Sequence, residues 1–130
     1  MTRRVEAAHE AGHAVGGKVV GARKVVVVPK FFGGWDVKAK RLPNARAALI
    51  FLLAGEYAAG TSEGCGSALF GDGDRAAFES TLREYSAGER SAVRREVQRE
   101  TRRLVRANAA WIERVADCLL EHGKLKSGVL

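Results

Sequence analysis

The stretch AAHEAGHAV, residues 7–15, places His9 and His13 four positions apart, with Glu10 directly after the first histidine. On an α-helix, residues four apart lie on one face, with their Cβ atoms about 5–6 Å from each other. Two imidazoles in this arrangement can both reach one Zn²⁺ ion, at bond lengths of about 2.0–2.1 Å. Glu10 is offset around the helix, where its carboxylate can accept a proton from a water at the metal. The spacing therefore predicts a zinc-binding helix with Glu10 as general base.

The alternative is a helix that carries two histidines and no metal, because a five-residue pattern also occurs by chance. Two features favour the metal site. His9 and His13 are two of only three histidines in the chain. Small residues surround them at four positions: Ala7, Ala8, Ala11 and Ala14. Gly12 costs a helix interior about 1 kcal/mol relative to alanine, and we interpret it as making room for the metal and a substrate.

A catalytic zinc needs a third protein ligand and leaves its fourth position to water. The glycine-rich stretch Gly60–Gly73 is predicted to be a loop, and long loops in small domains are often functional. Its edge and interior offer four candidate ligands: Glu63, Cys65, Asp72 and Asp74. Asp74 lies where the loop meets the next predicted helix, which fixes a side chain well, whereas Asp72 can instead serve as the N-cap of that helix. The sequence favours Asp74. The remaining histidine, His122, is too distant in sequence to judge.

Hydrophobic patterning predicts one α+β domain over residues 1–130, mostly helical with a small β-hairpin and a long C-terminal helix. A helix N-capped by Thr2 is expected to reach Gly16 and Gly17. The next elements are expected in this order: a strand at 23–29, a turn at 33–34, a strand at 35–39, an apolar helix at 45–59 and a short helix at 74–85. The spacing of Ser86 and Glu89 fits a capping box that opens the last helix. Its apolar stripe reaches about Glu121 before Gly123.

The composition is that of a globular protein, with 46% hydrophobic and 28% charged residues. The longest apolar run, residues 47–55, is too short to cross a bilayer, and the charged N-terminus lacks the apolar core of a signal peptide. Cys65 and Cys118 form no disulfide framework. We therefore expect a cytoplasmic protein without a membrane segment.

The net charge of +7 raises the possibility of nucleic-acid binding. Much of the excess lies in one segment, where arginines outnumber Glu96 and Glu100: Arg90, Arg94, Arg95, Arg99, Arg102, Arg103 and Arg106. Spaced arginines and glutamates are also typical of a solvated helix face with pairs three and four residues apart. We favour the solvated face, because no groove-reading motif or aromatic platform accompanies the arginines.

With these residues in hand, the chain resembles the peptidase domain of the FtsH-type AAA+ zinc metalloproteases. Four segments carry the resemblance, in the family's order and nearly end to end: AAHEAGHAV (7–15), KVVVVPKFFGGWDV (24–37), FLLAGEYAAG (51–60) and RRLVRANAAWIERVADCLLEHGKL (102–125). The resemblance implies that His9 and His13 are zinc ligands, that Glu10 is the general base, and that Asp74, or failing it Asp72, is the third ligand. It also implies that a peptide lies as an added strand beside Val25, Val26, Val27 and Val28.

These observations predict a zinc-dependent endopeptidase. The 130 residues hold no ATPase module, so we expect its substrates to be flexible or unfolded polypeptides. A separate ATPase or a homo-oligomer remains open as a partner. Two other interpretations stay open: an inactive peptidase-fold binding or assembly module, and a nucleic-acid-binding protein that uses the arginine-rich helix.

Overall fold

The computed structural model describes residues 2–60 and 72–130. Its elements follow in chain order: α1 (Arg3–Val19), β1 (Lys24–Pro29), β2 (Trp35–Lys40), α2 (Ala45–Gly60), α3 (Asp72–Leu82), α4 (Arg90–Ala107) and α5 (Ala109–His122). The fold is α+β and mostly helical, with a single antiparallel hairpin in the described part, as the patterning predicts. None of the described helices combines the length and the apolar character needed to cross a membrane.

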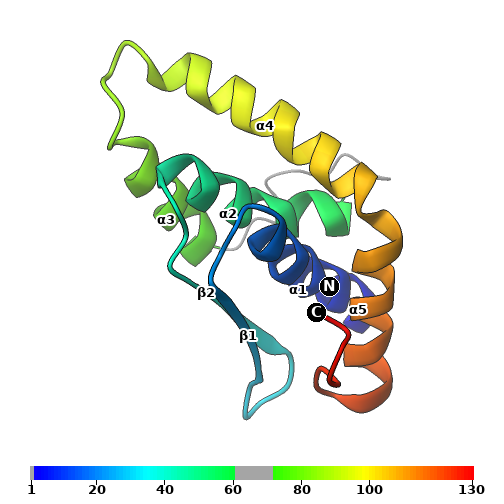
Figure 1. Ribbon diagram of the computed structural model, residues 1–130. Coiled ribbons are helices and arrows are strands. Elements are labelled where there is room, and N and C mark those ends of the chain that lie inside the picture. Colours follow the sequence, from blue (N-terminus) through cyan, green and yellow to red (C-terminus); the bar gives the residue numbers. More distant parts are fainter. Residues whose placement is uncertain (1, 61–71) are drawn as a thin grey trace.

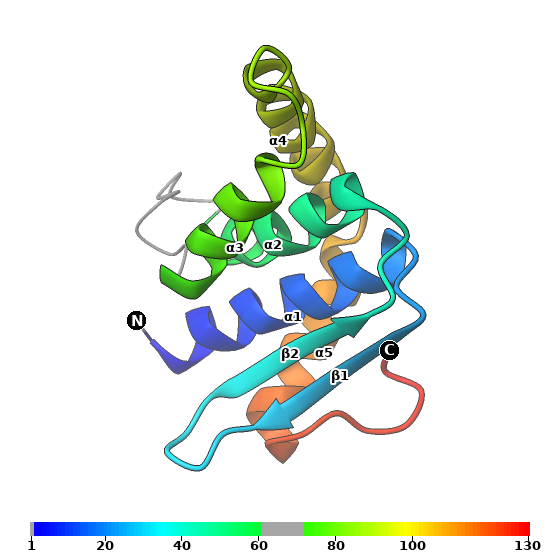
Figure 2. The same cartoon turned by 90° about the vertical axis from the view of Figure 1, so that its left-hand side faces the viewer.

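Helix α1 is the central element, and it packs against α2, α5 and the hairpin. Figures 1 and 2 show α2 along one side of α1 and the two strands along the other. Thr2 caps the helix as predicted, since its hydroxyl accepts a hydrogen bond of 3.1 Å from the amide of Val5. The helix ends at Val19, two residues later than predicted. The largest fully buried apolar side chains are Phe78, Leu49, Leu119, Val15, Val97 and Val115.

The close contact between α1 and α2 depends on glycines of α1, which have no side chain. A Cβ on Gly12 would lie 2.5 Å from the carbonyl oxygen of Ala54 and 2.5 Å from the Cβ of Ala58. A Cβ on Gly16 would lie 2.6 Å from the Cβ of Ala54. The interpretation that Gly12 clears space for a metal and a substrate is therefore wrong. Gly12 lets the backbone of α2 approach α1.

The hairpin lies against α1 through one of its faces. Its register runs from Lys24 opposite Lys40 to Pro29 opposite Trp35. Trp35 is buried, and its indole nitrogen donates a hydrogen bond of 2.9 Å to the carbonyl of Gly123, just after α5. This bond ties the hairpin to the end of the last helix.

The region that the sequence presents as one long helix is two helices, α4 and α5, which meet at Asn108. The side-chain amide of Asn108 donates 2.9 Å to the carbonyl of Leu104, an acceptor that its backbone amide also uses at 3.0 Å. Such side-chain bonds to a carbonyl four residues back compete with regular helix. Gly123 ends α5 in the left-handed conformation at φ 72°, as expected for a C-terminal glycine.

The predicted capping box at Ser86 is also wrong. Its hydroxyl bonds the carboxylate of Glu89 at 2.5 Å, but α4 begins only at Arg90, so the pair belongs to the turn before the helix. Helix α3 ends at Leu82 rather than Tyr85, because the amide of Tyr85 bonds the Leu82 carbonyl three residues back in a tighter turn.

The acidic side chains of α4 do not form the predicted pairs within their own helix. Glu96 and Glu100 both bind Arg46 of α2, at 3.2 and 2.6 Å. Arg94 reaches across to Glu79 of α3 at 2.8 Å. These ion pairs join α4 to its neighbours. Arg102 is exposed but lies over the ring of Tyr57 on α2, 5.3 Å from its centroid. Four further arginines of α4 are exposed: Arg95, Arg99, Arg103 and Arg106.

Candidate metal centre

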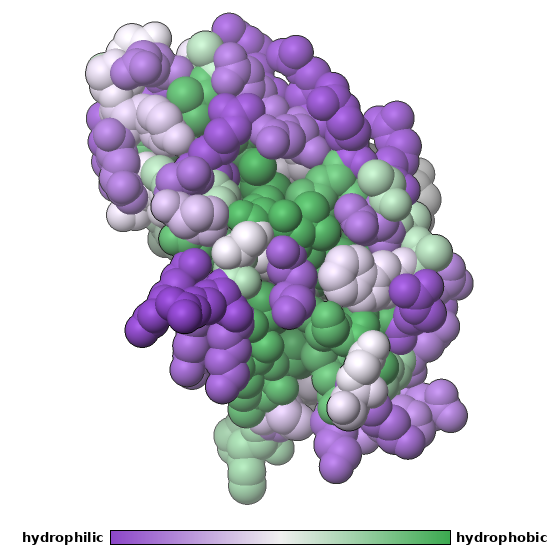
Figure 3. All heavy atoms as spheres, in the orientation of Figure 1, coloured by the Kyte–Doolittle hydropathy of each residue, from purple (hydrophilic) through white to green (hydrophobic). Residues whose placement is uncertain are grey.

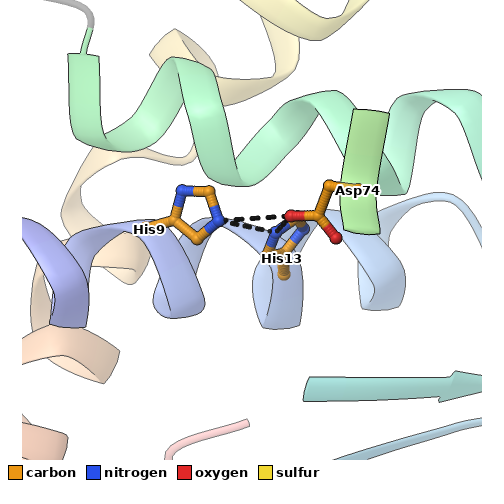
Figure 4. Close-up of side chains that lie close together, drawn as sticks. All are labelled: His9, His13 and Asp74. Carbon is orange, nitrogen blue, oxygen red and sulfur yellow. Dashed lines mark hydrogen bonds and ion pairs between the residues drawn. The ribbon is translucent and has the colours of Figure 1, made fainter. Parts of the chain in front are cut away.

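Three side chains converge from two helices (Figure 4). His9 and His13 project from the same face of α1, and Asp74 projects from the first turn of α3. The Nε2 atom of His13 lies 3.0 Å from that of His9 and 3.0 Å from Oδ2 of Asp74, and the third separation is 3.4 Å. Ligands around a tetrahedral zinc are about 3.3 Å apart when the bonds are about 2.0–2.1 Å. The three atoms therefore have the spacing of one face of a zinc tetrahedron.

The other candidate ligands fall into two groups. Glu63 and Cys65 lie outside the described residues, as does most of the predicted loop; Gly60 ends α2, and Asp72 and Gly73 already belong to α3. The side chain of Asp72 is not described. His122 lies at the end of α5, 3.8 Å from Glu121, away from the other two histidines. Within residues 2–60 and 72–130, the convergent group consists of His9, His13 and Asp74.

The hydrogen bond on the far side of His13 fixes the state of its ring. Nδ1 lies 2.8 Å from the backbone carbonyl of Phe51 on α2, and a carbonyl oxygen only accepts. Nδ1 must therefore carry a hydrogen, which in the neutral ring leaves Nε2 as an acceptor. Nε2 then faces the carboxylate of Asp74, a second acceptor, at 3.0 Å. Two acceptors this close need a cation or an extra proton between them.

Gly55 provides the space that the His13 ring occupies. It lies one helical turn after Phe51 on α2, and a Cβ there would come within 2.6 Å of Cδ2 and 2.7 Å of Cε1 of the imidazole. Any residue larger than glycine at this position would displace the ring. Phe51 and Gly55 thus act together, one orienting His13 and the other admitting it.

The carboxyl groups of the site differ in their proton affinity. Burial by itself raises the pKa of Asp74, but its close contacts with His13 and His9, and the positive charge of these rings when they are protonated, lower it well below its ordinary value. Burial raises the pKa of Glu10 to about 7, with the charge of Asp74 acting in the same direction and those of His9 and Lys30 opposing it. Asp74 is thus held as an anion, and Glu10 can exchange a proton near neutral pH.

Glu10 lies near charged groups of both the convergent side chains and the hairpin. His9 and Asp74 of the first, and Lys30 and Asp36 of the second, all act on its pKa. The hairpin and the metal-site candidates therefore border the same half-buried carboxylate.

The sequence analysis does not predict one buried acidic residue near the site. Glu56 of α2 is buried, and its burial raises its pKa, while the charges of Arg75 and His9 oppose that rise. His9 Nδ1 is itself buried and has no hydrogen-bond partner among the described residues. A ligating histidine usually donates its second ring nitrogen to a carboxylate, carbonyl or water. The signal for Glu56 in the sequence is a single charge inside the apolar run FLLAGEYAAG.

The four valines expected to bind a peptide form most of β1. Val25, Val26 and Val27 are half-buried and Val28 is exposed. Among the described residues β1 pairs only with β2, so its other edge has no strand beside it. One edge of β1 is therefore unpaired among the described residues, and peptide binding at this edge stays a prediction.

No protein-family model matches the sequence, and no curated protein matches it.

Proposed function

We propose that the chain is a zinc-dependent metallopeptidase whose metal ligands are His9, His13 and Asp74. The observation that carries the proposal is the 3.0 Å contact between two acceptors. One is the carboxylate oxygen Oδ2 of Asp74, and the other is Nε2 of His13, which the hydrogen bond to Phe51 leaves as an acceptor in the neutral ring. A shared cation relieves this contact, and two imidazoles with one carboxylate form a donor set found at catalytic zinc. The order of the four segments that resemble FtsH-type peptidases supports the same function.

The chain's own residues account for proton transfer in peptide hydrolysis. Zinc, when bound, would act as a Lewis acid and lower the pKa of a water at the metal. Glu10 holds the attacking water, accepts its proton as the carbonyl is attacked, and delivers that proton to the leaving amine. Burial raises the pKa of Glu10, which favours proton uptake, and the positive charge of a bound zinc would act in the opposite direction. Asp74 stays ionised throughout, which suits a ligand and not an acid.

We propose flexible or unfolded polypeptides as substrates, bound in extended form along the hairpin. An added strand gains main-chain hydrogen bonds from an unpaired sheet edge and requires little of the substrate's sequence. Val25–Val28 on β1 offer such an edge, since β2 covers only the opposite side of that strand.

The first test is the metal content of the purified full chain, measured by elemental mass spectrometry. We expect about one zinc per chain, lost from His13→Ala and Asp74→Ala, because each removes one of three ligands. His122→Ala is the matched control: it removes the histidine outside the group and should keep the metal. Absence of zinc from the wild-type chain, even after zinc is supplied, would contradict the proposed metal site.

The second test separates hydrolysis from metal binding. Glu10→Gln should keep its zinc and lose about a hundredfold to ten-thousandfold of its activity on an unfolded, fluorescently labelled polypeptide, because the proton acceptor is gone. Glu113→Gln, an exposed change on α5, is the control and should keep full activity. A zinc-loaded wild-type chain without activity would instead support the inactive binding module, and an active Glu10→Gln chain would exclude Glu10 as the base.

A further inference from the structure

The turn of the hairpin carries two phenylalanines that the protein leaves in solvent. Phe31 is 93% exposed and Phe32 is 97% exposed, although large apolar side chains are usually buried. Their rings pack only edge to face on each other, with centroids 4.9 Å apart. In Figures 1 and 2 the turn stands clear of the helices, at the same end of the molecule as the end of α5, and pale green atoms lie at that end in Figure 3. The aromatic pair thus forms an apolar projection at one extremity.

The hairpin that carries this pair is strongly basic. Residues 23–41 contain six basic side chains and one acidic side chain, so they hold five of the chain's seven net positive charges. All six basic side chains are exposed: Arg23, Lys24, Lys30, Lys38, Lys40 and Arg41.

The strand register places three of these lysines on one face. Val25 and Ala39 face α1, since a Cβ on Gly17 would lie 3.2 and 3.4 Å from them. Alternate residues of a strand point to opposite faces, so Lys24 and Lys40, which are paired, point away from α1. Lys38 lies on that outer face too, with Asp36 and exposed Val28, which are paired, nearer the turn. The three lysines therefore lie on the outward face of the strands, behind a turn that exposes both phenylalanines.

We propose that this hairpin docks the protein on the surface of an anionic lipid membrane. Phenylalanine side chains enter the boundary between headgroups and acyl chains, and exposed lysines are attracted to anionic headgroups. Stable attachment of a peripheral protein usually takes two such contributions together, and the hairpin supplies both. The turn enters the lipid first, and Lys24, Lys38 and Lys40 remain at the level of the headgroups.

Two other occupants fit this surface less well. A second copy of the chain would bring two strongly basic hairpins together, and like charges in contact are destabilising. Single-stranded nucleic acid needs aromatic faces along a basic groove on which bases stack. Here the rings lie at the apex of a turn, edge to face on each other, and the outer strand face carries Val26, Val28 and Asp36 beside the lysines.

The test is co-sedimentation of the full chain with vesicles of phosphatidylcholine, with and without about one third phosphatidylglycerol. We expect binding to the anionic vesicles that weakens as salt is raised. The double change Phe31→Ser and Phe32→Ser should lower the affinity about tenfold to a hundredfold, because two apolar side chains no longer leave water. Lys24→Ser, Lys38→Ser and Lys40→Ser together should lower it by a similar factor.

The matched control removes the same charge from another surface. Arg95→Ser, Arg99→Ser and Arg103→Ser on α4 should leave vesicle binding unchanged within about twofold, since that row lies on another element. Circular dichroism melting checks that each variant is folded. The proposal is overturned if the wild-type chain does not bind anionic vesicles, or if the phenylalanine variant binds them as tightly as wild type. It is also overturned if the α4 variant loses as much vesicle affinity as the hairpin lysine variant. Phenylalanine-dependent binding of a single-stranded oligonucleotide without vesicle binding would assign the surface to nucleic acid.

Discussion

At the scale of single residues, the position of His13 depends on α2 as much as on its own helix. Replacing Gly55 by alanine puts a methyl group within 2.7 Å of the imidazole, so the ring must leave its place and its bond to Phe51. We expect zinc affinity to fall about tenfold to a hundredfold, as for other losses of a group that orients a ligand. Competition with a zinc-binding dye measures the change.

Gly73→Ala is the control for this prediction. Gly73 lies directly beside Asp74, but a Cβ there meets nothing within 4 Å. Its zinc affinity should stay within about twofold of wild type, because the aspartate is not displaced. Equal zinc affinity in Gly55→Ala and wild type would show that His13 does not need the observed ring position to bind the metal.

The sequence predicts the side chains that form the site better than it predicts the groups that hold those side chains in position. Helical spacing alone brings His9, Glu10 and His13 together, and the predicted helix start brings Asp74 within reach. His13 bonds the backbone carbonyl of Phe51, a group that every residue has, so no sequence pattern identifies it as the partner of His13. The need for Gly55 arises only when α1 and α2, which the hairpin separates in the sequence, lie against each other.

At the scale of elements, the close packing of α1 on α2 predicts the effect of adding one methyl group. Alanine favours a helix over glycine by about 1 kcal/mol. At Gly12, however, its Cβ would overlap the Ala54 carbonyl and the Ala58 side chain at 2.5 Å, and overpacking costs about 1–3 kcal/mol or more. We expect Gly12→Ala to destabilise the fold by roughly 1–2 kcal/mol in urea denaturation.

Gly88→Ala shows what the same change does in open space. A Cβ at Gly88 meets nothing within 4 Å, so its stability should change by less than about 1 kcal/mol. If Gly12→Ala were as stable as wild type, the two helices would have room to separate, and their close approach would not depend on a glycine at this position.

Element types follow from periodicity, whereas element ends depend on local hydrogen bonds. The valine run and the apolar stripe of α2 predict a strand and a helix, because burial of one face requires those spacings. The break at Asn108 leaves the apolar stripe uninterrupted, since Leu104 and Ile112 on either side are both buried. The two helices are separated at Asn108, whose backbone leaves the helical conformation at φ −113° and ψ 19° and whose side chain bonds the Leu104 carbonyl.

At the scale of the whole molecule, the proposed metal joins two elements that are far apart in the chain. His9 and His13 belong to α1 and Asp74 to α3, so the ligands meet only in the folded protein. A ligand that binds the folded state alone stabilises it by about 4 kcal/mol at a free concentration a thousand times its dissociation constant. For a chain of 130 residues this corresponds to a rise in the midpoint of thermal unfolding on the order of 10 °C.

We therefore expect zinc to raise the unfolding midpoint of the wild-type chain, and expect Asp74→Ala to lose most of that rise because the link to α3 is cut. Asp117→Ala, which removes an exposed aspartate paired with Arg4, should keep it. Differential scanning calorimetry with matched zinc and chelator samples measures each shift. An equal rise in the Asp74→Ala chain would mean that zinc stabilises α1 through its two histidines alone. A metal would then not be needed to explain why α1 and α3 lie together, and Asp74 would no longer be a proposed ligand.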